Sequence, residues 1–311
     1  MTLKNQKIAV LKGGPGSERK VSLKSAESVV EALKTLEVEV VEIDVTSTDF
    51  QIPNDILIAV NMIHGTFGED GELQAILEKG GVRYTGAGVE SSRVAFDKAL
   101  SKAKFVAAKV PTPSSQLLCL DGQDQLKLTL PVVVKPLCEG SSVGVHIVHT
   151  ADELALALED AKRFGKTTLV EEFIQGKELT VGILGEEALP IIHIEPVSGF
   201  YDINNKYPWM SGTGKTNYHC PADLDEVTTK RVQDAALAAM KAVGVEVYGR
   251  VDLMLREDGE PFVLEINTIP GMTVSSLLPK AAHAVGIEFP ELMERIIELS
   301  MIARSANKPA N

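Results

Sequence analysis

Two apolar segments near the C-terminus carry acidic residues, and this pattern restricts the possible folds more than any other part of the chain. We expect strands at residues 247–255 and 262–266, because both segments are rich in Val and Leu and a Glu-Asp-Gly-Glu turn separates them. Asp252 and Glu265 lie inside these segments, where a buried carboxylate is costly unless a cation or hydrogen bonds meet it. A hairpin would bring both acids together with Asn267 on one face.

These oxygen ligands favour a hard cation. Carboxylate and amide oxygens, without nitrogen or sulfur ligands, suit Mg²⁺ or Mn²⁺ better than Zn²⁺. Arg250 precedes Asp252 by two residues, so both side chains point to the same face of the strand. Surface charge on an edge strand is the alternative for either acid alone, but it explains less well why both acids and Asn267 occur together. The segment therefore predicts magnesium-dependent nucleotide chemistry.

The bulk properties of the chain exclude several classes of protein. Its 311 residues are enough for two or three domains with a large core. The net charge of −12 argues against a nucleic-acid partner, because phosphate backbones need a basic surface. No run approaches the roughly 18 apolar residues of a membrane span, and residues 1–7 lack an apolar signal core. The three scattered cysteines are typical of reduced thiols, so we expect a cytoplasmic protein without membrane partners.

Residues 1–100 alternate predicted strands and helices, which is typical of a parallel-sheet α/β domain. The apolar positions of the first helix repeat at helical spacing. The expected strands are residues 7–11, 38–43, 56–60 and 82–84, and the expected helices are 18–36, 73–77 and a long one over 91–108. Pro111 and Pro113 then break the chain and mark a domain boundary.

Two further units follow, over residues 101–186 and 187–311. The first has expected strands at 116–120, 131–135, 168–173 and 178–184 and expected helices near 124–128 and at 151–164. The second has an expected strand at 189–195, a polar loop over 198–220, a helix at 225–243, the two acidic strands, and helices after 273 and 290. The fold class we expect is therefore α/β with three domains.

A Gly-Gly-Pro-Gly sequence at residues 13–16 joins the first expected strand to the first expected helix. Such a loop offers free N–H groups to an anion, and Asp44 ends the next strand, where dinucleotide-binding domains keep a ribose-binding acid. Against a dinucleotide site, Arg19 stands where the third glycine of that motif belongs. Glu18 opens the helix, and its carboxylate either pairs with the helix dipole or binds the ammonium group of a substrate.

Two further loops follow the ends of strands. The loop HGTFGEDG begins at His64, at the carboxyl end of a parallel strand, where open α/β sheets bind ligands; turn formation alone is the alternative. Lys135 ends a buried strand before the loop CEGSSVG, and an ammonium with loop N–H and hydroxyl groups suits a triphosphate. No Gly-Lys-Ser/Thr sequence opens a helix here, so this is not a Walker loop, and a plain hairpin is the alternative. His146 and His149 are expected to point to opposite faces of a strand, so we predict a structural role for both.

Two weaker signals come later in the chain. The strand that ends in Glu171 and Glu172 before a glycine turn is able to line an adenine slot, although acids at strand ends are usually just solvated. The loop over residues 199–209 holds the single tryptophan and places Lys206 beside Tyr207. Long ordered loops of this kind are typical of lids over an active site.

In this order, the motifs resemble those of the ATP-grasp ligases, and within them the D-alanine–D-alanine ligases. The resemblance runs from about residue 7 to about residue 299 and implies a three-domain ATP-grasp fold. Its most specific parts are the sequences ERKVSL, HGTFGEDG, DK at 97–98, KP followed by EGSSVG, GRVDLML and EINTIPGMT. The set Glu18, Ser141 and Tyr207 is narrower and points to D-alanine. Segment 208–219 departs from the family pattern, because it is longer than usual.

The resemblance implies an ATP site and a metal site between the second and third units. The implied ATP-binding residues contact the phosphates (Lys98 and Lys135), the adenine (Glu171 and the backbone of Ile174) and the ribose (Glu178). The implied ligands of two Mg²⁺ or Mn²⁺ ions are Asp252, Glu265 and Asn267.

The resemblance also implies the contacts of two D-alanine molecules. Glu18 would bind the ammonium of the first, with His64 near its carboxylate, and Ser276 and Leu277 would bind the carboxylate of the second. The remaining implied roles are oxyanion stabilisation by Arg250 and the N–H of Gly271, a contact of Lys206 with the γ-phosphate and the intermediate, and a hydrogen-bonded link of Ser141 and Tyr207 to Glu18.

The function implied is ADP-forming ligation of two D-alanine molecules through an acyl phosphate, by a homodimer that serves peptidoglycan synthesis. A D-alanine–D-lactate ligase is the nearest alternative, and Tyr207 argues against it, since depsipeptide-forming relatives lack this tyrosine. A nicotinamide-dependent oxidoreductase would rest on the first glycine loop and Asp44, and the metal-type segment disfavours it. A non-catalytic nucleotide sensor is disfavoured because every phosphate lysine and metal ligand is present.

Overall fold

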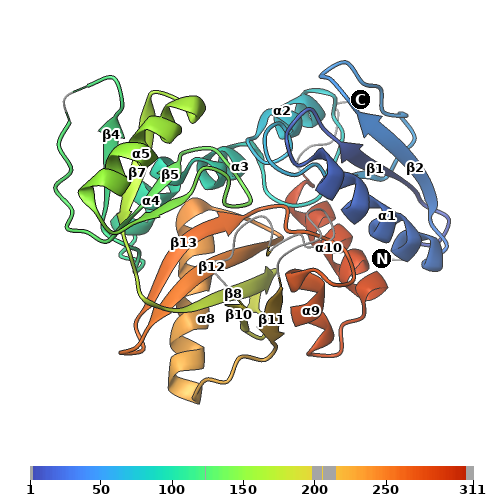
Figure 1. Cartoon of the computed structure of the whole chain (residues 1–311). Coiled ribbons are helices and arrows are strands. Elements are labelled where there is room, and N and C mark those ends of the chain that lie inside the picture. Colours follow the sequence, from blue (N-terminus) through green and yellow to red (C-terminus); the bar gives the residue numbers. More distant parts are fainter. Residues whose placement is uncertain (1–2, 123, 198–204, 206–214, 306–311) are drawn as a thin grey trace.

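The computed structural model describes residues 3–122, 124–197, 205 and 215–305. Three sheets form the framework of the molecule, one for each of the three expected units (Figure 1). In this part of the chain, no helix combines the length and the apolar character needed to cross a membrane. All three cysteines are free thiols.

The N-terminal sheet is parallel, as predicted, with the strand order β2-β1-β3. The elements of this unit are β1 (Lys7–Gly13), α1 (Arg19–Thr35), β2 (Glu39–Val45), β3 (Ile58–Asn61), α2 (Glu72–Lys79) and α3 (Val89–Phe96). The central strand β1 is buried along most of its length, which explains why its sequence is continuously apolar rather than alternating. The strand expected at 82–84 is reduced to a single parallel bridge between Ala59 and Tyr84.

The single helix expected over 91–108 is wrong, because two helices meet at Asp97. This residue has an extended backbone (φ −85°, ψ 108°) and separates α3 from α4 (Lys98–Ala107). Its side chain accepts hydrogen bonds from the N–H groups of Ala99 (2.8 Å) and Leu100 (3.1 Å). An aspartate whose side chain bonds to the backbone caps a new helix instead of continuing the old one. The apolar spacing runs through the break and does not reveal it.

The central unit has an antiparallel sheet with the order β4-β7-β5-β6. Its further elements are β4 (Ser115–Cys119), β5 (Val132–Pro136), β6 (His146–Val148), α5 (Ala151–Ala161), the 3-10 turn η1 (Lys162–Phe164) and β7 (Thr167–Glu172). The helix expected near 124–128 does not form. Instead, Gln116 accepts a hydrogen bond from the N–H of Lys127 (2.8 Å), and Asp124 accepts one from Cys119 (2.9 Å). A five-residue segment gains too few helical hydrogen bonds to compete with such contacts.

The C-terminal sheet is antiparallel, with the order β11-β10-β8-β12-β13 and with β9 paired to β8. The elements are β8 (Gly176–Leu184), β9 (Glu187–Ala188), β10 (Ile192–Pro196), β11 (Thr216–His219), α8 (Glu226–Val243), β12 (Tyr248–Arg256), β13 (Pro261–Asn267), α9 (Leu277–His283) and α10 (Phe289–Ala303). β8, which a boundary at residue 186 places in the central unit, pairs with β10 and β12. The domain limits 1–100, 101–186 and 187–311 stay a prediction, and the pairing of β8 favours a second boundary near residue 175.

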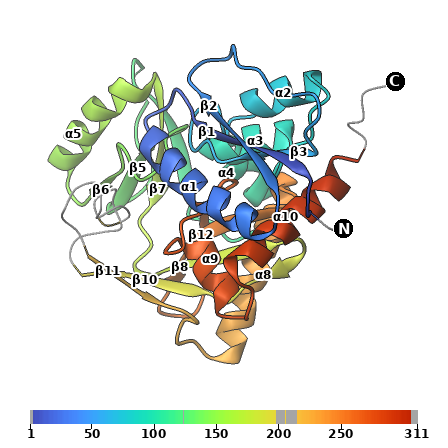
Figure 2. The same cartoon turned by 90° about the vertical axis from the view of Figure 1, so that its right-hand side faces the viewer.

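The helix α10 returns to the N-terminal unit. It packs against α1 and β3, and Figure 2 shows α1 and α10 side by side. Buried side chains of α1, β3, α9 and α10 belong to one continuous hydrophobic cluster, which includes Val29, Val60, Leu278 and Ile297. The N-terminal and C-terminal units therefore share a core, and this shared core fixes the start of α1 relative to the loop before α9.

Candidate active site

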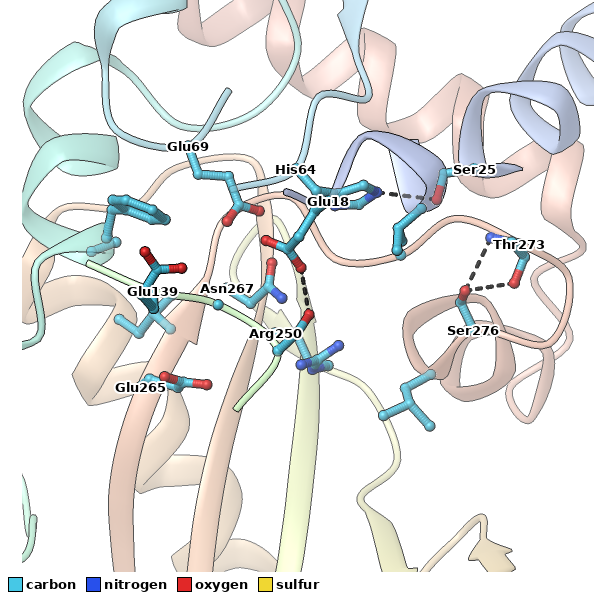
Figure 3. A pocket seen from close by; sticks show the side chains of 18 of the residues that line it. Glu18, Ser25, His64, Glu69, Glu139, Arg250, Glu265, Asn267, Thr273 and Ser276 are labelled. Atoms are coloured by element: carbon cyan, nitrogen blue, oxygen red, sulfur yellow. Dashed lines mark hydrogen bonds between the residues drawn. The ribbon is translucent and has the colours of Figure 1, made fainter. Parts of the chain in front are cut away.

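A cavity of about 270 Å³ is lined by side chains from all three units. The start of α1, the loops after β3 and β5, the strands β12 and β13 and the loop before α9 contribute to its wall. Its charged and polar lining includes Glu18, Ser25, His64, Glu69, Lys98, Glu139, Ser141, Arg250, Glu265, Asn267, Thr273 and Ser276. Figure 3 shows the carboxylates of Glu18, Glu69 and Glu139 turned toward the same space. Most of the residues predicted from sequence thus meet in one place.

The hairpin of β12 and β13 forms as predicted and carries four predicted site residues on one face; Arg250, Glu265 and Asn267 line the cavity, and Asp252 lies behind Arg250. Asp252 lies directly opposite Glu265, and Arg250 lies opposite Asn267. Arg250 makes two bonds to Asp252, from Nε to Oδ1 (2.9 Å) and from Nη2 to Oδ2 (2.8 Å). The hydroxyl of Thr180 donates a third to Asp252 Oδ1 (2.6 Å). These bonds satisfy the carboxylate that sequence reasoning identified as costly to bury.

The donor set on this face suits a hard cation. In the described part of the chain, no group of three or more His, Cys, Asp and Glu side chains forms a metal site, and the set here consists of two acids and an amide. The side chain of Glu265 is 33% exposed, so its oxygens are accessible from the cavity. Three protein oxygens leave coordination positions that phosphate oxygens and water can fill. The chemistry of Asp252, Glu265 and Asn267 therefore fits Mg²⁺ or Mn²⁺, but Asp252 would have to exchange one of its bonds to Arg250 or Thr180 for the metal.

Lys98 stands beside the metal-type carboxylate. Its Nζ lies 3.4 Å from Glu265 Oε2 and donates a hydrogen bond to the backbone oxygen of Glu139 (2.6 Å). Lys98 is the first residue of α4, so the helix break at Asp97 determines where its ammonium group lies. The ammonium group of Lys98 thus connects β13 with the glycine loop after β5.

The carboxylate of Glu18 occupies a slot between two glycines. A Cβ atom added at Gly65 or Gly140 would lie 2.6 Å or 2.7 Å from Glu18 Oε2, so a larger residue at either position would displace the carboxylate. Ser141 Oγ donates a hydrogen bond of 2.5 Å to Glu18 Oε1. Ser141 and Ser142 have φ values of 52° and 60°, a left-handed conformation that costs about 1–3 kcal/mol per residue. The link between Glu18 and Ser141 joins the N-terminal and central units at the cavity.

Three side chains of the N-terminal unit contact the loop that follows β13. Glu69 Oε1 accepts a hydrogen bond from the N–H of Ile269 (3.1 Å), and His64 Nδ1 lies 2.7 Å from the carbonyl oxygen of the same residue. Ser25 Oγ accepts from the N–H of Met272 (3.2 Å) and lies 3.1 Å from His64 Nε2. Because a carbonyl can only accept, Nδ1 of His64 carries the proton and Nε2 accepts from the Ser25 hydroxyl.

Burial controls the charge of two of these groups. It lowers the pKa of His64 below the ordinary 6.5, because the imidazolium form loses its hydration. Burial raises the pKa of Glu69 well above the ordinary 4.5, and repulsion from the Glu18 carboxylate adds to this rise. Both shifts favour the neutral form of the side chain, which for His64 is the form that its two hydrogen bonds require.

The loop before α9 forms the wall of the cavity near Gly271. A Cβ atom added at Gly271 would lie 3.0 Å from the hydroxyl of Ser276. That hydroxyl accepts from the N–H of Thr273 (3.0 Å) and lies 2.7 Å from Thr273 Oγ1. Ser276 directly precedes Leu277, the first residue of α9. Gly271, predicted to stabilise the oxyanion, and the residues predicted to bind the second carboxylate therefore lie on one stretch of backbone, whereas Arg250 lies on β12.

Glu171 lies between two lysines, the buried Lys102 and the largely buried Lys135. Lys135 Nζ is 2.6 Å from Glu171 Oε2, and Lys102 Nζ is 2.6 Å from Oε1. Although burial opposes ionisation of Glu171, first Lys135 and then Lys102 hold its pKa below the usual range. Burial lowers the pKa of Lys102, whereas for Lys135 the attraction of Glu171 outweighs burial and raises the pKa. The adenine contact expected of Glu171 stays a prediction, because both of its oxygens already have a partner.

The other residues predicted to bind the nucleotide lie on the connection from β7 to β8. Ile174 lies between β7 and β8 along the chain, and its side chain is buried. Glu178 is half-buried on β8, opposite Met254 of β12. Glu178 is near enough to Lys135 to raise its pKa. The predicted adenine and ribose contacts thus lie where the chain passes from the central sheet to the C-terminal sheet.

Lys206 and Tyr207 lie outside the described residues, and so do residues 208–214. The expected roles of these two residues stay predictions. Their neighbour Asn205 accepts a hydrogen bond from the N–H of Lys215 on its side chain (3.1 Å) and one from Thr216 Oγ1 on its backbone oxygen (3.2 Å).

The N-terminal glycine loop does not join the site as a phosphate-binding loop would. The N–H of Gly13 donates to Ser22 Oγ (2.8 Å), and that of Gly14 donates to the carbonyl of Val45 (2.7 Å). Asp44 is engaged by Arg19 through both carboxylate oxygens (2.8 Å and 2.7 Å). These contacts argue against the dinucleotide interpretation.

The two histidines after the glycine loop of the central unit have partners of the structural kind. His146 Nε2 lies 2.9 Å from Asp160 on α5, and the His149 ring lies edge-on to Phe173. These contacts favour the structural role predicted for both.

Three buried site residues were missed by sequence reasoning, namely Ser25, Glu69 and Lys102. Ser25 lies on the buried stripe of α1, where a hydroxyl among apolar residues needs a partner. Lys102 follows Lys98 by one helical turn and so lies on the same side of α4. Both signals were present in the sequence, but neither indicates which distant residue is the partner.

Residues 100–298 match the family model described as the D-ala D-ala ligase C-terminus. A D-alanine–D-alanine ligase of Methylacidiphilum infernorum (isolate V4) is 46% identical over 301 residues, which cover 96% of this chain and 97% of the relative. The crystal structure of the D-alanine–D-alanine ligase from Bacillus anthracis is 35% identical, with a TM-score of 0.86 and coverage of 97% of this chain and 99% of that chain. A structure of the Bacillus anthracis enzyme complexed with ATP is 34% identical, with a TM-score of 0.83 and the same coverage.

Proposed function

This chain belongs to the D-alanine–D-alanine ligase family, and from that premise we propose that it joins two D-alanine molecules into D-alanyl-D-alanine for peptidoglycan synthesis while ATP is converted to ADP. One observation carries the proposal. A single cavity holds a carboxylate seated between two glycines, Glu18, and an arginine beside metal-type oxygens, Arg250. An amino acid carries an ammonium group that can pair with Glu18 and a carboxylate that can pair with Arg250.

The first D-alanine binds with its ammonium at Glu18 and its carboxylate toward Arg250. The hydrogen bond from Ser141 fixes the orientation of the Glu18 carboxylate, and His64 lines the same cavity. Two of the four substituents on the α-carbon are then held, so the methyl group and the hydrogen have one arrangement that fits. This is the physical basis for selection of the D-enantiomer.

ATP binds between the central and C-terminal sheets. Lys98 and Lys135 contact its phosphates, Glu171 and the backbone of Ile174 meet the adenine, and Glu178 meets the ribose. Two Mg²⁺ or Mn²⁺ ions, held by Asp252, Glu265 and Asn267, would neutralise phosphate charge during the transfer. The structure of the Bacillus anthracis relative complexed with ATP supports ATP as the nucleotide.

The reaction has two steps. An oxygen of the first carboxylate attacks the γ-phosphorus, the bond to ADP breaks, and an acyl phosphate forms, with Lys206 near the transferred group. The uncharged amine of the second D-alanine, whose carboxylate binds Ser276 and Leu277, then attacks the acyl carbon. Arg250 and the N–H of Gly271 stabilise the oxyanion, inorganic phosphate leaves, and the nitrogen releases a proton as the peptide bond forms.

Water must be kept from the acyl phosphate between the two steps. Two segments would cover the intermediate: the loop with Ser141, and the lid with Lys206 and Tyr207. A homodimer and a cytoplasmic location belong to the same proposal, because the family resemblance implies both. Sedimentation of the purified protein tests the dimer independently of activity.

The activity is tested by incubating the protein with ATP, Mg²⁺ and D-alanine and reading the products by mass spectrometry and phosphate release. We expect D-alanyl-D-alanine and stoichiometric phosphate, with more product at alkaline pH, because the second amine must be uncharged to attack. L-Alanine is the control substrate and should give no dipeptide. Absence of a dipeptide from D-alanine, or an equal yield from L-alanine, would overturn the proposal, and a depsipeptide formed in comparable yield from added D-lactate would favour the D-lactate ligase instead.

A further inference from the structure

We propose that Ser25 and Glu69, together with His64, are positioning residues that fix the N–H of Gly271 toward the reacting carbonyl. We call these three side chains the clasp. The inference rests on the proposed function, because it gives a purpose to the oxyanion contact at Gly271. None of the three needs to touch the reacting atoms for this role.

The clasp holds the backbone on both sides of Gly271. Before it, both polar backbone groups of Ile269 are engaged, the N–H by Glu69 (3.1 Å) and the carbonyl by His64 (2.7 Å). After it, the N–H of Met272 is engaged by Ser25 (3.2 Å). Pro270 stands between, and its ring fixes φ. The peptide N–H of Gly271 is therefore bracketed by fixed groups, although glycine by itself is the most mobile residue of a chain.

The clasp also connects the oxyanion loop to the metal-type face. The N–H of Ile269 is shared between Glu69 and the side-chain oxygen of Asn267, which lies 3.2 Å away. Within the clasp, Ser25 and His64 are bonded to each other, as the dashed line in Figure 3 shows. A shift of Glu69 would therefore reach Asn267 as well as Gly271.

The clasp groups are all polar and buried, although they lie beside the hydrophobic cluster that the N-terminal and C-terminal units share. Ser25 is 0% exposed, His64 5% and Glu69 9%. Apolar side chains at these positions would extend this cluster without the cost of desolvating a hydroxyl, an imidazole and a carboxyl. Hydrogen bonds are directional, whereas apolar contacts are not, so the polar set fixes the loop in one position. A fixed loop position is needed for an oxyanion donor, whereas hydrophobic packing between two units does not require it.

The first test compares Ser25→Ala with Ser22→Ala. Both serines are fully buried on α1, and both accept a backbone N–H, but Ser22 holds Gly13 rather than Met272. We expect Ser25→Ala to lower kcat by between about 10-fold and 10²-fold, since a displacement on the order of 1 Å costs about 10²-fold, with the KM for ATP unchanged. Ser22→Ala should retain the kcat of the parent. Equal kcat in the two variants would overturn the clasp.

The second test compares Glu69→Gln with Glu69→Met. Gln keeps an oxygen that accepts from Ile269, whereas the thioether of Met is a weak acceptor of similar length. We expect Gln to retain kcat and the KM for D-alanine, and Met to lower kcat as Ser25→Ala does. If Glu69 instead bound the substrate ammonium as a carboxylate, Gln and Met would raise the KM for D-alanine alike, and that result would overturn the positioning role.

Hydrogen exchange of the peptide that covers residues 268–277 gives a readout without catalysis. Its amides should exchange faster in Ser25→Ala and Glu69→Met than in the parent, and at the parental rate in Ser22→Ala and Glu69→Gln. Equal exchange in all four variants would contradict the clasp. If the unsubstituted protein formed no dipeptide, the proposed function would fail, and this measurement would still decide whether the clasp holds the loop.

Discussion

At the scale of single residues, the two acids of the β12–β13 hairpin, Asp252 and Glu265, are expected to matter most for turnover. We predict that Asp252→Asn and Glu265→Gln each lower turnover by at least about 10²-fold, because a carboxylate proposed to hold Mg²⁺ would lose its charge. Asp258→Asn, in the turn of the same hairpin, removes the same charge far from the cavity and should leave turnover unchanged. Steady-state rates at saturating Mg²⁺ check this, and near-normal rates for both site variants would remove the metal assignment.

Glu69 gives a prediction about pH. Burial first, and then Glu18, raise the pKa of Glu69 well above 4.5, so the folded protein keeps a proton that the unfolded chain loses. Between pH 4.5 and the folded pKa, the free energy of unfolding therefore falls as pH rises. Glu69→Gln lacks this proton, so its stability relative to the parent should increase with pH across that window. Denaturation midpoints at several pH values check it, and a constant difference would show that Glu69 titrates normally.

The residues proposed to contact ligands could be named from the sequence, whereas the buried polar residues that support them could not. Glu18, Lys135 and Asp252 stand in local sequence patterns whose chemistry is legible without a partner. Ser25 and Lys102 have their meaning only through Met272 and Glu171, which are distant in the sequence. Spacing along one element indicates a buried polar side chain, but the identity of its partner depends on how the units pack.

At the scale of elements, the break at Asp97 positions Lys98, the lysine proposed to contact the phosphates of ATP. We predict that Asp97→Ala lowers stability by about 1 kcal/mol, as for other lost N-caps, and raises the KM for ATP, because Lys98 begins the helix that Asp97 caps. Thr150→Ala removes the N-cap of α5, whose side chain accepts from Glu153 N–H, and should lower stability similarly without changing that KM. An equal KM for ATP in the two variants would show that the N-cap at Asp97 does not position Lys98 for ATP binding.

The elements themselves were predicted where one pattern dominates. The hairpin of β12 and β13 and the buried strand β1 follow directly from apolar runs and turn residues. The failures at 91–108 and 124–128 have one cause: the side chains of Asp97, Asp124 and Gln116 bond to the backbone and replace helical hydrogen bonds. Such competition is decided by a single contact, which a periodic pattern does not register.

At the scale of the whole molecule, the seam between α1 and α10 decides stability. We predict that Ile297→Ala lowers the free energy of unfolding by about 2–5 kcal/mol, because Ile297 is fully buried in the core shared by the N-terminal and C-terminal units. Ile302→Ala, on the same helix, makes the same chemical change at a side chain that is 72% exposed and should have little effect. Urea titrations followed by circular dichroism check this, and equal midpoints would show that the seam is not part of the cooperative core.

The packing of α10 on α1 has a consequence for synthesis on the ribosome. Domains usually fold from the N-terminus as they emerge, but the face of α1 that α10 covers is synthesised long before the helix that covers it. Until residues 289–303 have left the exit tunnel, that apolar face meets water or a chaperone. The cavity needs Glu18 at the start of α1 in its final place, so a nascent chain stalled before α10 would carry nearly every active-site residue and still lack an assembled site.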